Sequence, residues 1–529
     1  MIDVVLHDGI VLDGTGTAGF RTDVAIAGDA IVRIGQCAEL DAALRLDCTG
    51  LCVAPGFIDM HGHSDELLFA NPLAESKIRQ GITTEIGGNC GSSPGPLSDD
   101  AWRERRDRLS ALYGIDLTWR DMEGFFEELE RRPAAINFCC LAGLGDARAA
   151  AGFPEPGKLD RDGQAKLAAT VRIACEQGAI GISSGLIYPP GSFADLDELV
   201  AAAIAARSAG SPLYATHVRS EGDALVEAID EALSVGRGGD VAVQLSHHKA
   251  SGKQNWGKVH DTLAHVDRAR DRGLDVVLDQ YPYKASSTGL DVILPADVNV
   301  GSRPEIARRL ADKRYAALVA ARVELAYAGR WGEVLIAAVV TGANKSCEGK
   351  TIAAIASERG VAPVRAALDL LVEETLDVAA IYFTMCEDDV RTVLSYPHTC
   401  IGSDSSVRSP TGPTSRGKPH PRAYGTFPRL FKRYVRDARL LGLAEAVRRA
   451  TSLPASRIGL RRRGLLAEGW FADVVVFDPE RIADTATYED PHRFPDGVAH
   501  VLVNGVTTVR GGATTGSRPG RVLRRGRDL

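Results

Sequence analysis

The stretch that decides the fold is Ala54-Pro55-Gly56-Phe57-Ile58-Asp59-Met60-His61-Gly62-His63-Ser64-Asp65. It predicts a short apolar strand that ends in two histidines one residue apart. Side chains at positions i and i+2 of a strand point to the same face, so His61 and His63 could bind one metal ion. Two solvated histidines in a loop would give the same pattern. The rest of the chain has to decide between these interpretations.

Length and composition set the broad class of the protein. A chain of 529 residues exceeds the size at which one core usually divides, so we expect one large domain and one smaller domain. The net charge of −7 provides no basic surface, and a nucleic-acid partner is therefore not expected. No apolar run reaches the roughly 18 residues of a membrane span. The N-terminus lacks the basic and apolar regions of a secretory signal.

The 10 cysteines are scattered, and several lie inside apolar runs. This distribution is typical of reduced thiols rather than of a disulfide framework. We therefore expect a cytoplasmic protein that acts on a small molecule without a membrane partner. The sequence leaves the oligomeric state open.

Apolar stretches at the two ends of the chain predict a small β domain built from both. They lie at 3–7, 23–27 and 30–34 near the N-terminus, and at 473–477 and 500–505 near the C-terminus. Turn residues separate them, as in antiparallel sheets. We predict a β-sandwich assembled from residues 1–53 and 456–529.

Between the two ends, apolar runs rich in β-branched residues alternate with helical patterns. The runs lie at 53–59, 82–87, 136–142, 179–184, 213–216, 241–246, 274–279 and 399–403, with helices expected at 160–177, 195–209, 223–235 and 259–272. Near-continuous apolar strands separated by helices are typical of a parallel sheet covered by helices. A doubly wound open sheet fits the alternation too, but the number of strands favours a (β/α)8 barrel over residues 54–455.

The interval between the seventh and eighth strands, about 288–398, is too long for a single connection. It contains helical patterns at 303–330, 351–359 and 364–374, and a buried strand or helix at 334–340. We predict an insertion that covers the barrel mouth as a lid. The stretch 405–421, rich in Ser, Pro, Gly and Arg, is expected to be a loop.

Residues that can bind a metal recur where the predicted strands end. They are His61, His63, Cys90, His217, His247 and Asp404. Barrel enzymes carry their catalytic groups at this end of the strands. Imidazole, thiolate and carboxylate are suitable zinc ligands, and zinc with an open coordination position activates water. Taken singly, Cys90 is more often a buried inert thiol and Asp404 a helix cap, so the shared position carries the prediction.

Together these residues resemble the amidohydrolase superfamily, and further motifs resemble its N-acyl-D-amino-acid deacylases, or D-aminoacylases. The motifs are Gly88-Asn89-Cys90-Gly91, Thr216-His217-Val218-Arg219, Ser246-His247-His248-Lys249, Asp279-Gln280-Tyr281-Pro282-Tyr283 and His420-Pro421-Arg422. The likeness extends over nearly the whole chain. It implies a zinc-dependent enzyme that hydrolyses the amide bond of N-acyl-D-amino acids.

The resemblance also implies roles for individual residues. It implies a tightly held zinc ion at Cys90, His217 and His247, and a weaker second ion at His61, His63 and Asp404, with Cys90 able to bridge the two. Many relatives bridge two ions with a carboxylated lysine, but the fourth-strand segment 179–184 contains no lysine, which agrees with a bridging Cys90.

By the same resemblance, the substrate-binding residues are Lys249, Tyr281, Ser287 and Arg422. We hypothesise that Asp404 takes the proton of a zinc-activated water and passes it to the leaving amine. Cations suit a free carboxylate, which arginine can bind with two hydrogen bonds. We expect apolar side chains on the substrate, because no further cation has a clear place in the site. Arg408 and Arg416 are the residues that would instead favour acidic substrates.

Three other functions share single features with this sequence. A cyclic amidase of the hydantoinase or dihydroorotase kind usually has the bridging lysine that is absent here. A metal-free, non-catalytic scaffold is expected to have lost ligands, yet all of the predicted ones are present. Nucleotide binding is rejected, because Gly342 lies seven residues before Gly349-Lys350-Thr351 where a phosphate loop requires five.

Overall fold

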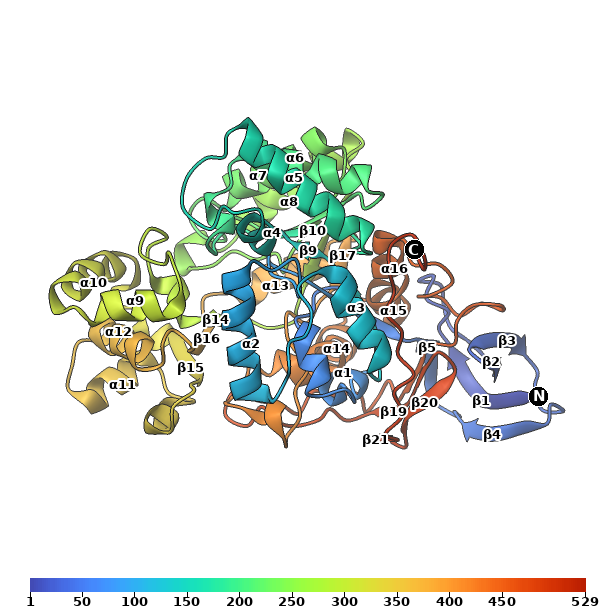
Figure 1. The fold of residues 1–529 in the computed structure, drawn as a ribbon. Coiled ribbons are helices and arrows are strands. Elements are labelled where there is room, and N and C mark those ends of the chain that lie inside the picture. The colour runs from blue at the N-terminus through green and yellow to red at the C-terminus, as the bar shows by residue number, and fades with distance from the viewer.

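A parallel β-barrel stands at the centre of the molecule, between a helical insertion on one side and a β-sheet on the other (Figure 1). The computed structural model describes residues 1–529. No helix is both long enough and apolar enough to cross a membrane.

Eight parallel strands form the barrel if the interrupted pair β8 and β9 is counted as one. They are β6 (Phe57–Asp59), β7 (Ile82–Gly87), β8 (Asn137–Cys140) with β9 (Ala142–Gly143), β10 (Ile182–Gly185), β11 (Leu213–His217), β12 (Ala242–Leu245), β13 (Val276–Gln280) and β17 (Thr399–Ile401). The backbone N–H groups of Met60 and Asp404 donate to the carbonyls of Ile401 (3.2 Å) and His61 (2.7 Å), which joins the first strand to the last. The barrel prediction is confirmed, and the open sheet is excluded.

Helices cover the outside of the barrel. Those predicted from the sequence form as α5 (Arg161–Glu176), α6 (Leu196–Ser208), α7 (Leu225–Gly239) and α8 (Lys258–Asp271). Asp160 and Asp195 cap the first two, because each side chain accepts a hydrogen bond from a backbone N–H of the first turn. The remaining helices around the barrel are α1 (Glu75–Ile78), α2 (Asp99–Tyr113), α3 (Met122–Arg131), α4 (Leu144–Ala150), α13 (Glu387–Ser395), α14 (Arg422–Arg429), α15 (Leu443–Ala450) and α16 (Ser452–Ile458).

The barrel interior is closed at one end. A buried cluster joins strand residues such as Ile58, Ile86 and Cys400 to Ile458 of α16 and to Leu523 of the C-terminal segment. Packing therefore fills the end at which the strands begin, and polar groups can gather only where the strands finish.

The first predicted strand, 53–59, is divided by Gly56. β5 (Cys52–Pro55) pairs with β1 (Ile2–Val11) and β18 (Val474–Phe477) in the small sheet, whereas β6 belongs to the barrel. A Cβ on Gly56 would lie 2.2 Å from the side chain of Thr83, so only glycine fits where the chain passes from one sheet to the other. The run predicted as one strand therefore serves two sheets.

Both ends of the chain meet in one nine-stranded sheet. Its other strands are β2 (Phe20–Ala27), β3 (Ala30–Gly35), β4 (Ala42–Asp47), β19 (Val498–Val503), β20 (Val506–Arg510) and β21 (Ala513–Thr514). β1 pairs with β4 along its first half and with β5 near its end, and the sheet encloses a buried cluster that includes Leu6, Val53 and Leu502. The small β domain made from both chain ends is confirmed. We retain its boundaries, 1–53 and 456–529, as a proposal, although 455 falls inside α16.

The insertion has its own core of 26 buried residues. Its elements are β14 (Ser286–Gly289), α9 (Arg303–Ala311), α10 (Lys313–Tyr327), β15 (Val334–Ala338), α11 (Ile352–Arg359), α12 (Pro363–Glu373) and β16 (Ala379–Tyr382). The single helix expected at 303–330 is broken at Asp312, whose side chain caps α10. The segment left open as strand or helix is the strand β15. The range 288–398 also takes in α13, which packs on α8 and β17 and so belongs to the barrel.

Candidate metal centre

Three of the six predicted ligands have a left-handed backbone. The φ angles of Cys90, His247 and Asp404 are 54°, 35° and 48°. Such angles are uncommon for residues other than glycine and cost about 1–3 kcal/mol each. Each of the three residues follows the end of a barrel strand, β7, β12 or β17. The chain is thus bent sharply where it delivers a ligand to the barrel mouth.

The turn that carries Cys90 is fixed from several sides. Gly88 has a φ of 69°, and a Cβ there would lie 2.0 Å from the carbonyl oxygen of Leu141. The backbone N–H of Gly88 donates to Asp65 at 2.8 Å. In the fourth strand, the Ser183 hydroxyl accepts from the N–H of Gly91 at 3.0 Å and donates to the carbonyl of Gly88. These contacts direct the thiol towards the mouth.

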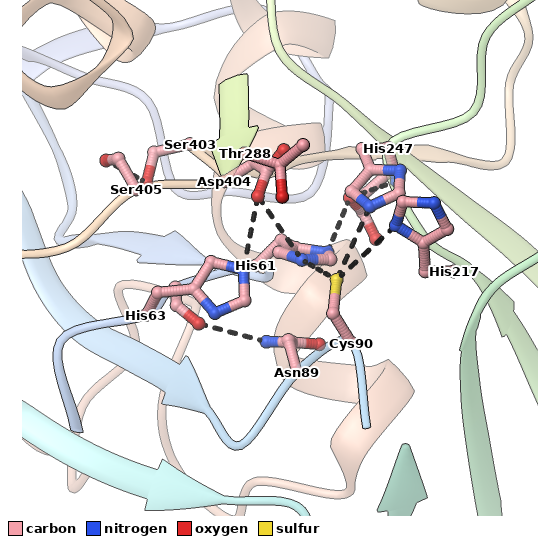
Figure 2. A network of polar contacts seen from close by, with 12 residues as sticks. His61, His63, Asn89, Cys90, His217, His247, Thr288, Ser403, Asp404 and Ser405 are labelled. Carbon is pink, nitrogen blue, oxygen red and sulfur yellow. Dashed lines mark hydrogen bonds and ion pairs between the residues drawn. The ribbon is translucent and has the colours of Figure 1, made fainter. Parts of the chain in front are cut away.

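All six predicted ligands come together in the structure (Figure 2). The sulfur of Cys90 lies 3.3 Å from His61 Nε2, 3.4 Å from His247 Nε2 and 3.9 Å from His217 Nδ1. On the other side, Asp404 Oδ1 lies 3.1 Å from His63 Nε2 and 3.7 Å from His61 Nε2. Five of the six ligands form two groups that share His61: one with Cys90 and His247, the other with His63 and Asp404, with the ligand atoms of each group within 4.8 Å of one another. His217 forms a third group with His247 and Glu221.

Glu221 is a site residue that the sequence analysis missed. One of its carboxylate oxygens lies 3.1 Å from His247 Nδ1 and 3.7 Å from His217 Nε2, and it also pairs with Lys249. A carboxylate behind a ligand histidine orients the ring and makes it a stronger ligand. The only sequence signal was its position four residues after His217. His217, Glu221 and His247 do not form a further cation site, because the Lys249 ammonium already lies 2.9 Å from His247 Nδ1.

Asp279 supports the ring of His61 and the backbone of His247. Its Oδ1 lies 3.2 Å from His61 Nδ1 and accepts a hydrogen bond from the backbone N–H of His247 at 2.8 Å. Gln244 donates to its other oxygen at 2.9 Å. In the sequence, Asp279 stands out only as part of a motif. In the structure it contacts two predicted ligands, His61 and His247.

The charges of the site favour a divalent cation. Burial alone would raise the pKa of the Cys90 thiol, but His61 and His247 outweigh it and hold that pKa well below its usual value. Burial would likewise raise the pKa of Asp404, and Arg422 and His247 hold it well below the ordinary range. A thiolate and a carboxylate among imidazoles form a donor set that fits zinc.

A cavity of about 630 Å³ opens above these residues. His63, Cys90, His217, His247 and Asp404 line it from the barrel. Residues of the insertion, among them Thr288, Ala337 and Tyr382, line the same cavity. The insertion thus borders the barrel mouth, and its action as a lid stays a prediction.

Of the four predicted substrate-binding residues, Lys249, Ser287 and Arg422 line the cavity. Arg422 Nη1 lies 2.9 Å from Asp404 Oδ2, and its Nη2 donates to the Ser287 carbonyl at 3.1 Å. The Ser287 hydroxyl donates to the carbonyl of Ala380 at 2.9 Å. Tyr281 is fully buried: its ring lies 4.6 Å from the Arg422 guanidinium, and its hydroxyl donates to the sulfur of Met385 at 3.7 Å.

The chain is similar to known proteins along nearly its whole length. A family model described as "Amidohydrolase family" matches residues 46–509. An N-acyl-D-glutamate deacylase of Alcaligenes xylosoxydans xylosoxydans is 39% identical over 526 residues, which cover 99% of this chain and 97% of the relative. A D-aminoacylase of the same organism is 37% identical over 524 residues, covering 99% and 98%.

A solved structure is similar over the same length. The N-acyl-D-glutamate deacylase of Bordetella bronchiseptica, in complex with zinc and a phosphonate inhibitor that mimics the tetrahedral intermediate, superposes with a TM-score of 0.84. It is 35% identical in sequence, and the match covers 99% of both chains.

Proposed function

The chain belongs to the amidohydrolase family, as a metal-dependent N-acyl-D-amino-acid deacylase, and on that premise we propose which residues carry out the deacylation. Cys90, His217 and His247 would hold one zinc ion tightly. His61, His63 and Asp404 would hold a second, weaker one, with Cys90 between them. The convergence of all six side chains at the barrel mouth supports this assignment most strongly.

Bound zinc supplies Lewis-acid polarisation of the amide carbonyl and lowers the pKa of water. Asp404 takes the proton from the attacking water and later gives it to the leaving amine. Its carboxylate is ionised in the free protein, because Arg422 and the neighbouring histidines favour the charged form. His63 Nε2, 3.1 Å from Asp404 Oδ1, holds that carboxylate in place.

The substrate's free carboxylate binds Arg422 and Lys249, with Ser287 beside them on the first strand of the insertion. Arg422 offers a planar pair of N–H groups that matches a carboxylate. Tyr281 would contribute through Arg422, whose guanidinium lies over its ring. Because Arg422 and Asp404 are in contact, the carboxylate and the scissile amide would lie close together, as they do in an N-acyl amino acid.

Two substrate side-chain classes have support. Val292, Ala337 and Tyr382 of the insertion give the cavity an apolar wall, which suits the apolar side chains expected from the sequence. Arg408 and Arg416 line the same cavity, and the Arg416 guanidinium lies 5.8 Å from the ring centre of Tyr113. A guanidinium in a binding cavity can bind a substrate carboxylate. An acidic side chain is therefore our second candidate.

A substrate panel tests these proposals. Zinc-loaded protein is offered the N-acetyl derivatives of D- and L-leucine, methionine, glutamate and aspartate, together with a hydantoin. Hydrolysis confined to the D series is the expected result. Hydrolysis of the L series alone, or of the hydantoin alone, would contradict the proposal. The ratio of kcat/KM for leucine and glutamate within the D series decides between the two side-chain classes.

A further inference from the structure

One buried ammonium lies beneath the part of the centre formed by His61, His63 and Asp404. Lys77, on the short helix α1, is 0% exposed. Its Nζ donates to Asp59 Oδ2 at 2.8 Å, to Ser403 Oγ at 2.9 Å and to the Ser405 carbonyl at 2.7 Å. These three bonds use every hydrogen of the ammonium. Glu85 Oε2 completes the surroundings at 3.4 Å.

The groups that Lys77 binds add further hydrogen bonds between the first and last barrel strands. Asp59 Oδ1 accepts from the backbone N–H of Ser403 at 2.8 Å and from that of His61 at 3.3 Å. The Ser405 carbonyl accepts from the backbone N–H of His63 at 3.0 Å as well as from Lys77. Asp404 lies between the two serines. One intermediate group therefore connects Lys77 by hydrogen bonds to the backbone of His61 and of His63. Lys77 also binds both chain neighbours of Asp404.

Glu85 supports the same segment from the second strand. Its carboxylate accepts from the Ser64 N–H at 2.9 Å and from the Ser64 hydroxyl at 2.8 Å. It also fills the space beside Gly62, where a Cβ would lie 2.0 Å from Glu85 Oε1. The segment that carries His61 and His63 therefore rests on a carboxyl group that lies 3.4 Å from the Lys77 ammonium.

The other half of the centre is supported differently. His217 and His247 contact Glu221, Asp279 binds the backbone of His247 as well as facing His61, and Asp65 and Ser183 hold the turn of Cys90. Lys77 makes no hydrogen bond or ion pair with any of these. Its removal should therefore affect the two metal positions unequally.

We propose that Lys77 is a positioning residue for the second metal ion, because it fixes the junction of β6 and β17 on which His61, His63 and Asp404 are mounted. The Lys77 ammonium lies between two buried carboxyl groups, Asp59 at 2.8 Å and Glu85 at 3.4 Å, which would be costly to bury without a cation. From the same position it binds the backbone carbonyl of Ser405, next to Asp404. The inference rests on the two-ion centre proposed above.

The test is a metal titration of the full chain carrying Lys77→Met. Metal-free protein is titrated with cobalt(II), whose visible absorption reports coordination by the Cys90 thiolate. The first ion should bind as in the wild type, whereas the second should bind about 10- to 100-fold more weakly, the usual effect of losing a supporting group behind metal ligands. With zinc, kcat should fall while KM changes little, because Asp404 moves and Lys249 does not.

Arg148→Met is the matched control. Arg148 is also fully buried, and it pairs with Glu198 at 2.9 Å on the outside of the barrel. Losing it should lower the melting temperature without changing the affinity for either ion. This control separates a general loss of stability from a displacement of the metal ligands.

An unchanged affinity of Lys77→Met for the second ion would overturn the proposal. If the wild type binds only one ion, an unchanged kcat of Lys77→Met would overturn it. If Lys77→Met does not fold, Ser403→Ala decides, because it removes one Lys77 hydrogen bond and leaves every charged group in place. It should weaken the second ion selectively, and native affinity would refute the inference. A wild-type protein that takes up no zinc, or that hydrolyses no N-acyl-D-amino acid, would instead contradict the proposed function.

Discussion

The guanidinium of Arg422 lies 2.9 Å from the carboxylate of Asp404. The residue proposed to bind the substrate is therefore the partner of the residue proposed to move the proton. Arg422 is also the strongest influence that lowers the pKa of Asp404 against the effect of burial. A substrate carboxylate that shares Arg422 would raise that pKa towards the range of an effective base. With the proposed roles, this contact would couple substrate binding to proton transfer.

Asp404→Asn should keep its tightly bound zinc and lose turnover on the order of 10²- to 10⁴-fold, the usual contribution of a positioned acid–base group. The amide is similar in size but has no charge to accept a proton. The measurements are kcat for an N-acetyl-D-amino acid and zinc content by metal analysis. Full activity at normal zinc content would show that another group moves the proton.

Arg422→Met should raise KM roughly tenfold or more, since a hydrogen bond to a charged group contributes about 1.5–3 kcal/mol. It should also move the acid limb of the kcat/KM profile to higher pH, because the pKa of Asp404 is no longer held down. Arg422→Lys should restore the position of the limb better than it restores KM. Substrate amides, which lack the carboxylate, serve as the control, and their KM should change little.

Cys90 should be the first cysteine alkylated by iodoacetamide in metal-free protein, and zinc should protect it. Of the cysteines, only Cys90 and Cys386 are not fully buried. The pKa of Cys386 is raised by burial, whereas that of Cys90 is lowered by His61 and His247. Peptide mapping by mass spectrometry gives the order of labelling. Earlier modification of Cys386, or normal zinc content in Cys90→Ala, would argue against a thiolate ligand.

Metal-free protein should lose thermal stability between pH 6.5 and about 9. Burial lowers the pKa of His63, but the hydrogen bond to Asp404 outweighs it and raises the pKa from 6.5 to about 9. The stability that the charged ring contributes is complete below pH 6.5 and is lost as the pH rises through about 9. Zinc-loaded protein should show a flatter profile, because the ion replaces the proton. A metal-free His63→Asn variant with the same slope as the wild type would assign the effect elsewhere.

If the substrate side chain is acidic, Arg408→Ala or Arg416→Ala should lower kcat/KM for N-acetyl-D-glutamate about tenfold, the effect of one charged hydrogen bond. The value for N-acetyl-D-leucine should stay within twofold of the wild type, which makes it the internal control. Equal losses on both substrates would indicate a change in the shape of the cavity instead.

The barrel could be predicted because its signals are local. Each apolar run and each helical pattern is a property of adjacent residues, and the chemical types of the ligands mark the strand ends. The division of 53–59 had one local signal, the Pro55-Gly56 dipeptide, which is typical of a break in a strand. The close approach of Gly56 to Thr83, which the fold creates, shows that one sheet ends there and the other begins.

The groups that support the centre were also beyond the sequence. A single lysine or glutamate is most often a solvated surface residue. Lys77 is bonded to Ser403, which lies 326 positions away along the chain. Glu221 gains its role only when the ends of β11 and β12 lie side by side. Ligand types are local properties, whereas the partners that orient them come from the assembled fold.

Ser183 occupies the fourth strand, where a carboxylated lysine would be the alternative bridge between two ions. Such a lysine forms only by reaction with dissolved carbon dioxide, whereas a thiolate needs no further chemistry. The proposed centre, with Cys90 between the ions, would therefore assemble independently of dissolved carbon dioxide. The same ligand would expose it to peroxide, because a thiolate that can reach solvent is readily oxidised to a sulfenic acid.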